Sequence, residues 1–307
     1  MPQIRHCVLL ACLLSPLFAA INPGRILDYA APSPGPNYAL ASYRIWCPPM
    51  LGKLSAVLVM VPGSNSDGRT QVDDPEWRRF AEEHHLVLLA CFFKDKEPLL
   101  DEAYAQAAKG SGQTLLDALS SFAKSLEMPE IAEAPLLLWG VSAGGQFNYE
   151  FATWQPQRVL AFVVNKGGFY HTVPAPEATL RVPAIMFIGE RDLQRRIDAI
   201  NRVFSSGRSR GALWALAIEP GVGHESQGTV PLARVFFHSV LAARKSGTAC
   251  CAPAKASVLV FPEPWLASKD GKELRPASQS TALDETTNWL PDRATAEAWR
   301  DFVTRAP

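Results

Sequence analysis

The sequence predicts an α/β fold in which helices cover both faces of a mostly parallel central sheet. Its apolar runs are continuous rather than alternating, which is typical of strands buried on both faces. Segments with apolar residues at helical spacing lie between these runs. The resulting strand–helix–strand alternation favours a doubly wound sheet. A chain of 307 residues is long enough to bury such a sheet within one domain.

The strand candidates are short and come at regular intervals. An alternating segment at 43–47 stops at Pro48 and is predicted to be an early edge strand. The continuous apolar runs follow it, at 56–61, 86–90, 136–139, 159–164, 184–188 and 213–218.

Helices are predicted between these strands. Leu115, Leu119, Phe122 and Leu126 recur on one face of a helix. Further helical segments are expected at 146–154, 197–204 and 232–243, with a last helix after Pro291. The segments 30–36 and 276–288 are rich in turn-forming or polar residues, and both are predicted to be loops.

Composition excludes several classes of protein. Hydrophobic residues make up 48% of the chain and charged residues 20%, with a formal net charge of zero. These values are ordinary for a globular protein and argue against disorder. The sequence has no basic cluster of the kind that nucleic acids or anionic membranes require, so neither is expected as a partner.

The N-terminus has the pattern of a secretory signal peptide over residues 1–20. Arg5 precedes an apolar stretch at 7–14, and small residues end the segment at Ala20. The apolar stretch is shorter than the roughly 20 residues that span a bilayer. We therefore expect a secreted or periplasmic protein with no stable membrane anchor once the signal is removed. A buried N-terminal helix is the alternative.

The remaining residues, 21–307, are predicted to form one domain. Its core covers about 40–245, and the regular alternation stops after Gly247, which leaves a C-terminal extension at 246–307. Removal of the signal leaves four cysteines, Cys47, Cys91, Cys250 and Cys251. An even number permits disulfides in an exported protein, although the sequence does not give the pairing. Cys91 lies within an apolar run, where a free buried thiol is the alternative.

Ser142 carries the strongest chemical signal, because it lies in the pattern Gly140-x-Ser142-x-Gly144. A predicted strand at 136–139 precedes it and a predicted helix follows. This is the sequence form of a nucleophile elbow, in which a sharp strand-to-helix turn lifts a serine hydroxyl clear of the sheet. A side chain at Gly140 or Gly144 would crowd that turn, and the serine backbone is expected to be strained.

A serine nucleophile needs a base to take its proton and an acid to orient the base. Asp192 follows the predicted strand at 184–188, and we choose it as the acid over Glu190. Asp198 is expected on a helix surface. His224 lies in a glycine-rich loop after the strand at 213–218 and is the predicted base. The order serine, acid, histidine is the one that this kind of elbow uses.

The transition state also needs two N–H donors for the oxyanion that forms. Ala143, directly after the nucleophile, is predicted to supply one. The loop after the strand at 56–61 should supply the other from Ser64, with Asn65 as the alternative donor. Asn65, Tyr170 and His171 are further candidates to line a substrate pocket. His84 and His85 are expected to face solvent, and His238 lies within a helical segment.

These motifs together resemble the α/β-hydrolase superfamily. The chain is most similar to its extracellular esterase branch, which holds poly(3-hydroxybutyrate) depolymerases and feruloyl esterases. The matching segments are 43–46, 61–64, 140–144, 189–192 and 221–224. Pro62 departs from that branch by standing where a histidine is usual, which leaves the second oxyanion donor open.

The resemblance implies a serine esterase that acts through an acyl-enzyme on a small or polymeric ester. It implies no metal and no organic cofactor. A peptidase of the same fold, or a catalytically silent binding protein that keeps the fold, are the alternatives. The sequence does not give the oligomeric state.

Overall fold

The computed structural model describes residues 24–97, 102–246, 259–279 and 286–306. The predicted signal peptide lies outside these residues, as do Cys250 and Cys251. Among the described residues, none of the helices combines the length and the apolar character needed to cross a membrane.

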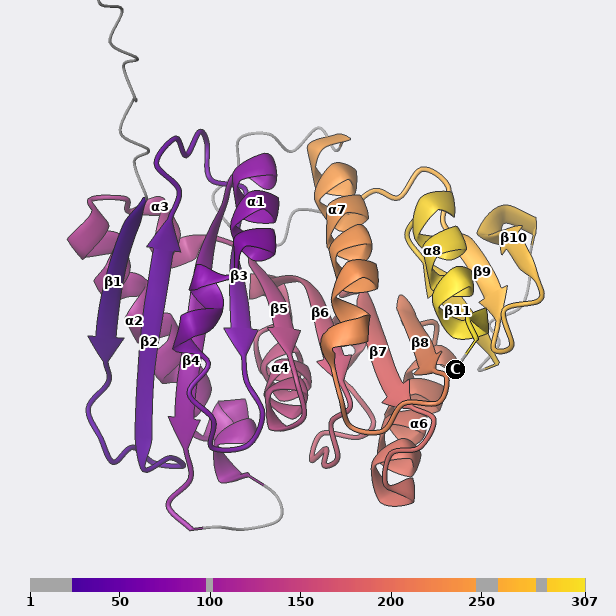
Figure 1. Ribbon diagram of the computed structural model, residues 1–307, viewed down its shortest axis with the longest axis horizontal. Coiled ribbons are helices and arrows are strands. Elements are labelled where there is room, and N and C mark those ends of the chain that lie inside the picture. The colour runs from indigo at the N-terminus through magenta and orange to yellow at the C-terminus, as the bar shows by residue number, and fades with distance from the viewer. Residues whose placement is uncertain (1–23, 98–101, 247–258, 280–285, 307) are drawn as a thin grey trace, which may run out of the picture.

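An eight-stranded sheet forms the centre of the molecule (Figure 1). Its strands lie in the spatial order β1-β2-β4-β3-β5-β6-β7-β8. In chain order they are β1 (Arg25–Ala30), β2 (Leu40–Cys47), β3 (Ala56–Val61), β4 (Leu86–Lys94), β5 (Leu136–Gly140), β6 (Val159–Asn165), β7 (Ala184–Gly189) and β8 (Trp214–Glu219). In this spatial order, every pairing between neighbouring strands from β4 through β3 to β8 is parallel, while β2 is antiparallel to both of its neighbours. Every residue of β3, β5, β6 and β7 is buried, as the continuous apolar runs predict.

Helices cover both faces of this sheet. One face carries α2 (Ser111–Leu126), α4 (Ala143–Trp154) and α6 (Gln194–Arg208), with the short helices α3 (Glu130–Glu133) and α5 (Glu177–Leu180). The other face, nearer the viewer in Figure 1, carries α1 (Pro75–His84), α7 (Val230–Ser246) and α8 (Arg293–Thr304). Each set of helices packs against its own hydrophobic cluster, so the sheet separates two cores.

The N-terminal edge of the sheet differs from the prediction. The expected edge strand at 43–47 is part of β2, which lies one position inside the sheet. The edge is β1, a strand that the sequence did not reveal because Arg25 and Asp28 interrupt its apolar residues. Its side chains are exposed or half-buried along its length, as suits an edge.

The first helix on the front face, α1, was also not predicted, although its ends carry clear local signals. Asp74 caps it by accepting hydrogen bonds from the N–H groups of Glu76 and Trp77, and Pro75 occupies its first turn. His85 ends it in the left-handed conformation. The segment contains so many polar residues that its narrow apolar stripe is hard to recognise in the sequence.

The C-terminal extension forms a small second sheet beside β8. Its strands are β9 (Trp265–Ser268), β10 (Leu274–Pro276) and β11 (Thr287–Leu290), in the order β10-β9-β11. The prediction of a loop over 276–288 is therefore wrong at both ends, where residues belong to β10 and β11. Short strands with few apolar residues give little periodic signal.

This extension covers the open edge of β8. The Leu216 N–H donates to Asn288 Oδ1 at 2.6 Å, and the Trp299 indole N–H donates to the Leu216 carbonyl at 3.0 Å. Side chains from β11 and α8 thus take the hydrogen bonds that a further strand would make. Because an unpaired edge is prone to pair with other chains, the extension protects the sheet.

Two described cysteines, Cys47 and Cys91, are free and buried. Burial raises the pKa of both thiols. Such thiols are chemically quiet, because the thiolate is the reactive form.

Candidate functional site

The predicted site residues gather at the carboxyl edge of the parallel strands, the lower edge of the sheet in Figure 1. Ser142 follows β5, Asp192 follows β7 and His224 follows β8. The loop after β3 brings Gly63 to the same place. Loops at this edge of an open α/β sheet are where ligand sites assemble, because the strand ends and helix N-termini converge there.

Ser142 has the strained backbone expected of an elbow, with φ 53° and ψ −118°. A serine in this region costs on the order of 1–3 kcal/mol, so the surroundings must hold it. Its N–H donates to the Asn165 carbonyl at 2.7 Å. A Cβ on Gly144 would lie 2.0 Å from the Val61 carbonyl oxygen, and one on Gly140 would lie 2.3 Å from the Gly144 carbonyl oxygen. Both glycines are therefore required by close backbone contacts.

His224 contacts both of its predicted partners. Its Nε2 lies 3.0 Å from Ser142 Oγ, and its Nδ1 lies 2.7 Å from Asp192 Oδ2. The structure thus brings together three residues that are up to 82 positions apart in the chain. The arrangement allows a proton to pass from the hydroxyl to the imidazole while the carboxylate fixes the ring.

The side chain of Asp192 is buried, with 3% of it exposed. Burial alone would raise its pKa, but hydrogen bonds from His224, the Leu193 N–H and the Arg196 guanidinium outweigh it and hold the pKa below its ordinary value. The carboxylate therefore stays ionised at neutral pH and can stabilise a positive charge on the imidazole.

The loop that carries His224 is fixed to neighbouring backbone. The Arg191 N–H donates to the Val222 carbonyl at 2.9 Å, and the Gly221 N–H donates to the Glu190 carboxylate at 2.6 Å. Glu190, the rejected candidate for the acid, therefore supports the loop of the base.

A buried charge network lies beneath this loop. Lys166 and Glu219 have side chains 0% and 2% exposed, and their charged atoms are 2.6 Å apart. Lys166 Nζ also donates to the carbonyl of Glu225, the residue after His224. Arg305, just after α8, pairs with the other oxygen of Glu219. The C-terminal extension is thereby linked to the base through two ion pairs and one hydrogen bond.

Ala143 and the loop that holds Ser64, the predicted oxyanion donors, both lie next to Ser142. Ala143 is the first residue of α4, so its N–H has no acceptor within the helix. A Cβ on Gly63 would lie 3.7 Å from Ser142 Cβ, which places the loop after β3 beside the serine. Within this loop, the Asn65 N–H donates to the Tyr104 hydroxyl at 3.4 Å, and the Asn65 side chain accepts from the Asp95 N–H. Asn65 is therefore occupied in shaping the loop, which favours Ser64 over it.

The other pocket candidates occupy the loop after β6. The hydroxyl of Tyr170 is buried, and burial raises its pKa well above the ordinary value. His171 is exposed, and its N–H donates to the Glu150 carboxylate at 2.7 Å. No contact between His171 and Ser142, Asp192 or His224 occurs in the part of the chain that the structure describes. Asp198 is exposed on α6, as expected.

Sequence reasoning missed four residues around this site: Gly63, Lys166, Glu219 and Arg305. Gly63 lies close to the end of the predicted strand at 56–61, and this position could have identified it as a site residue. Lys166 comes shortly after the apolar run at 159–164, and Glu219 comes directly after the run at 213–218. A charged residue in such a place suggests a buried ion pair. Nothing in the sequence near Arg305 connects it with a loop more than 80 residues away.

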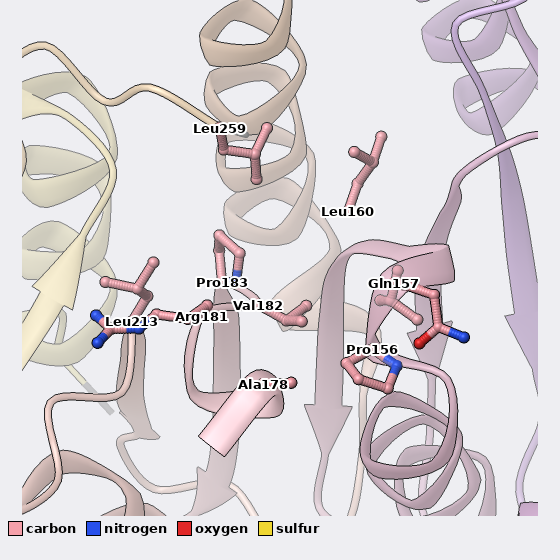
Figure 2. A pocket seen from close by; sticks show the side chains of 10 residues that line it. Pro156, Gln157, Leu160, Ala178, Arg181, Val182, Pro183, Leu213 and Leu259 are labelled. Atoms are coloured by element: carbon pink, nitrogen blue, oxygen red, sulfur yellow. The ribbon is translucent and has the colours of Figure 1, made fainter. Parts of the chain in front are cut away.

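An apolar cavity of about 510 Å³ lies elsewhere, at the amino ends of β6 and β7 (Figure 2). Leu160, Val182, Pro183 and Leu213 contribute to its wall. Because Ser142 lies at the carboxyl ends of the strands, this cavity is at the opposite edge of the sheet.

Comparisons with known proteins address the fold. No protein-family model matches the chain, and no curated protein matches its sequence. Among solved structures, LpqC, a poly(3-hydroxybutyrate) depolymerase from Bordetella parapertussis, matches with a TM-score of 0.51 and 19% identity. The match covers 70% of this chain and 88% of LpqC.

Two further matches have TM-scores of 0.49 and 16% identity. One is poly(aspartic acid) hydrolase-1 from a Sphingomonas species, with 69% of this chain and 97% of that chain covered. The other is a putative dienelactone hydrolase from Klebsiella pneumoniae, with 71% and 99% covered. The likeness to LpqC, together with the sheet order, confirms the predicted fold: the chain has the α/β-hydrolase fold.

Proposed function

We propose that the protein is a serine hydrolase of carboxylic esters. The observation that carries the proposal is the hydrogen-bonded series from Ser142 Oγ through His224 to Asp192. The strained backbone of Ser142 supports it, because strain of this kind is kept where function requires it. The N-terminus of α4 adds a positive partial charge next to the serine, which suits a developing oxyanion.

The first half of the proposed reaction forms an acyl-enzyme. Ser142 Oγ attacks the ester carbonyl carbon while His224 Nε2 takes the hydroxyl proton. The carbonyl oxygen becomes an oxyanion that accepts hydrogen bonds from the N–H groups of Ala143 and Ser64. The C–O bond to the alcohol then breaks, and His224 gives its proton to the leaving alkoxide.

The second half repeats these steps with water. His224 takes a proton from a water molecule, whose oxygen attacks the acyl carbon and forms a second oxyanion. The bond to Ser142 breaks, the serine recovers its proton from His224, and a carboxylic acid leaves. Asp192 stays ionised throughout and stabilises the imidazolium form.

The substrate proposed is a small or polymeric ester, and LpqC, as a named poly(3-hydroxybutyrate) depolymerase, is the reason for including a polyester. Secretion to the periplasm or the medium is also part of the proposal. It rests on the signal-like pattern of residues 1–20.

Labelling with a fluorophosphonate probe tests the nucleophile. The wild-type protein should become covalently labelled, while Ser142→Ala should not. Ser209→Ala serves as the control, because Ser209 is an exposed serine just after α6 and should leave labelling unchanged. Equal labelling of the wild type and Ser142→Ala would overturn the assignment of Ser142 as the nucleophile, and labelling of neither would favour a silent binding protein.

A substrate panel then tests the class of bond. Nitrophenyl, feruloyl and 3-hydroxybutyrate esters should be hydrolysed with a dependence on Ser142, whereas peptide anilides should not. Hydrolysis of the anilides at rates comparable to the esters would favour the peptidase alternative. N-terminal sequencing of the exported protein checks removal of residues 1–20.

A further inference from the structure

The histidine pair His84 and His238 lies on the front face of the molecule, away from Ser142. The prediction that His84 faces solvent is wrong, because only 5% of it is exposed. It occupies the same face of α1 as Trp77 and Phe80, seven and four residues earlier, and its ring lies 4.5 Å from that of Phe80. His85, the next residue, is exposed as predicted.

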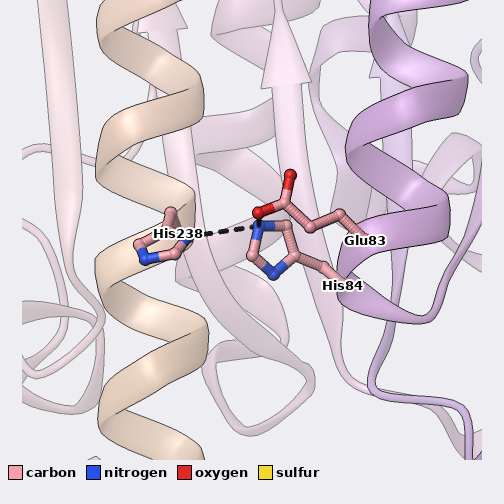
Figure 3. A group of neighbouring side chains, drawn as sticks. All are labelled: Glu83, His84 and His238. Carbon is pink, nitrogen blue, oxygen red and sulfur yellow. Dashed lines mark hydrogen bonds and ion pairs between the residues drawn. The ribbon is translucent and has the colours of Figure 1, made fainter.

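His84 points from α1 toward His238 on α7, and Glu83 reaches the same spot from α1 (Figure 3). His84 Nε2 and His238 Nδ1 are 3.3 Å apart, and Glu83 Oε1 is 3.9 Å from His84 Nε2. One ligand atom from each of the three side chains lies within 4.8 Å of the others. Of the described residues, no other His, Cys, Asp and Glu side chains form such a group.

The spacing of the two nitrogens suits a shared metal ion. Two imidazole nitrogens bound to one tetrahedral Zn²⁺ at about 2.0–2.1 Å lie roughly 3.3–3.4 Å apart. The observed separation of the two nitrogens, 3.3 Å, matches this value. Glu83 is 62% exposed, so its carboxylate can rotate to close the longer gap.

The neighbouring charges leave Glu83 available. Arg79 and Arg234 line the same cavity as Glu83, and both pair with Glu76. The three ligand groups line a cavity of about 310 Å³, which leaves room for water to complete the coordination.

We propose that His84, His238 and Glu83 form a binding site for a divalent transition-metal ion of the Zn²⁺ class. Two imidazoles and one carboxylate are a ligand set for Zn²⁺, Ni²⁺ or Cu²⁺, whereas Mg²⁺ and Ca²⁺ prefer all-oxygen sites. Because its ligands come from α1 and α7, the ion ties these two helices together on one face of the sheet. The site is independent of the ester hydrolysis proposed above.

A hydrogen bond between two neutral histidines accounts for the same 3.3 Å contact without a metal, so the test must separate the two. Isothermal titration of the metal-free protein with ZnCl₂ should give one site per chain, and saturation should raise the melting temperature, since a ligand that binds only the native state stabilises it. MgCl₂ should give neither effect. Cobalt in place of zinc should give the visible absorption of a nitrogen-ligated ion.

Variants at the exposed ligands locate the site. His238→Ala and Glu83→Gln should each weaken Zn²⁺ binding by at least about tenfold, since even outer-shell changes cost 10–100-fold at metal sites. His85→Asn is the matched control: it removes an adjacent exposed histidine, and asparagine tolerates the left-handed backbone there. Absence of stoichiometric binding to the wild type overturns the proposal, as does binding that His238→Ala leaves unchanged.

Discussion

Gly144 shows how a single residue fixes the shape of the site. A Cβ at this position would meet backbone atoms of the β3 end, at 2.0 Å from the Val61 carbonyl oxygen. Backbone cannot move aside as a flexible side chain can, so the elbow must distort. The glycine is thus required by packing between β3 and α4, and the sequence motif reflects that contact.

We predict that Gly144→Ala lowers the free energy of unfolding by about 2–3 kcal/mol or more and abolishes esterase activity. Urea unfolding and a nitrophenyl ester assay measure the two effects. Gly63→Ala is the control for stability, because its Cβ would meet nothing closer than 3.7 Å. A Gly144→Ala variant as stable and active as the wild type would contradict the role assigned to this contact.

A second prediction at the scale of one residue concerns Asp192. Its carboxylate orients His224, so Asp192→Asn should reduce kcat by about 10⁴-fold, as loss of this acid does in other serine triads. The expected readout is kcat at neutral pH with an unchanged circular dichroism spectrum. A loss of less than tenfold would exclude Asp192 as the orienting acid.

The lowered pKa of Asp192 also gives a direction for acid stability. Unfolded aspartate titrates near pH 3.9, above the folded value, so the unfolded state binds more protons between the two. The contribution of Asp192 is therefore complete above about pH 5 and is lost as the pH falls through its folded pKa. Urea unfolding between pH 6 and pH 3 should show a shallower loss of stability in Asp192→Asn than in the wild type.

Among the elements, β8 depends on residues far away in the chain. Its outward N–H and carbonyl at Leu216 are satisfied by Asn288 and Trp299 rather than by another strand. All three residues are buried, so water cannot take the place of a missing partner. This is why a short, weakly apolar extension is needed to complete a sheet with a strongly apolar core.

Asn288→Leu should therefore destabilise the protein by about 1–3 kcal/mol, the cost of leaving a buried N–H unsatisfied. Asn201→Leu on α6 is the control, since its amide donates to the Ile197 carbonyl of its own helix at a half-buried position. Chemical unfolding measures both. Equal stability of Asn288→Leu and the wild type would mean that Leu216 finds another partner.

The same elements show what the sequence could and could not predict. Continuous apolar runs located β3 and β5 to β8 within a residue or two, because burial on both faces leaves a strong local signal. β1, α1 and the small sheet were missed, since their apolar residues are few or interrupted by charges. The proximity of Ser142, Asp192 and His224 was predictable because each residue follows a strand whose end the fold places at one edge.

Contacts between distant segments were not predictable in this way. The burial of His84 depends on α1, which the sequence did not reveal, and its contact with His238 depends on α7 packing beside α1. The pairing of Glu219 with Arg305 depends on α8 ending next to the His224 loop. Such contacts follow from the whole fold, and a single sequence contains no local pattern for them.

At the scale of the whole molecule, the C-terminal extension reaches the proposed base through charges. Arg305 pairs with Glu219, Glu219 pairs with buried Lys166, and Lys166 donates to the carbonyl next to His224. Two cations share one buried carboxylate, which compensates its cost of desolvation. Loss of Arg305 should leave the Lys166–Glu219 ion pair intact. Without Arg305, however, this ion pair and the His224 loop should shift.

We predict that Arg305→Met lowers kcat for ester hydrolysis several-fold while KM changes little, because the variant alters the position of His224 and no substrate contact. Arg300→Met is the matched control: it removes a half-buried arginine of α8, five residues before Arg305, whose partner is the exposed Asp301. Arg305→Lys should recover part of the lost kcat, since it restores a cation near Glu219. If Arg305→Met and Arg300→Met have the same kcat, or if KM alone rises, the extension does not position the base and its role is confined to covering β8.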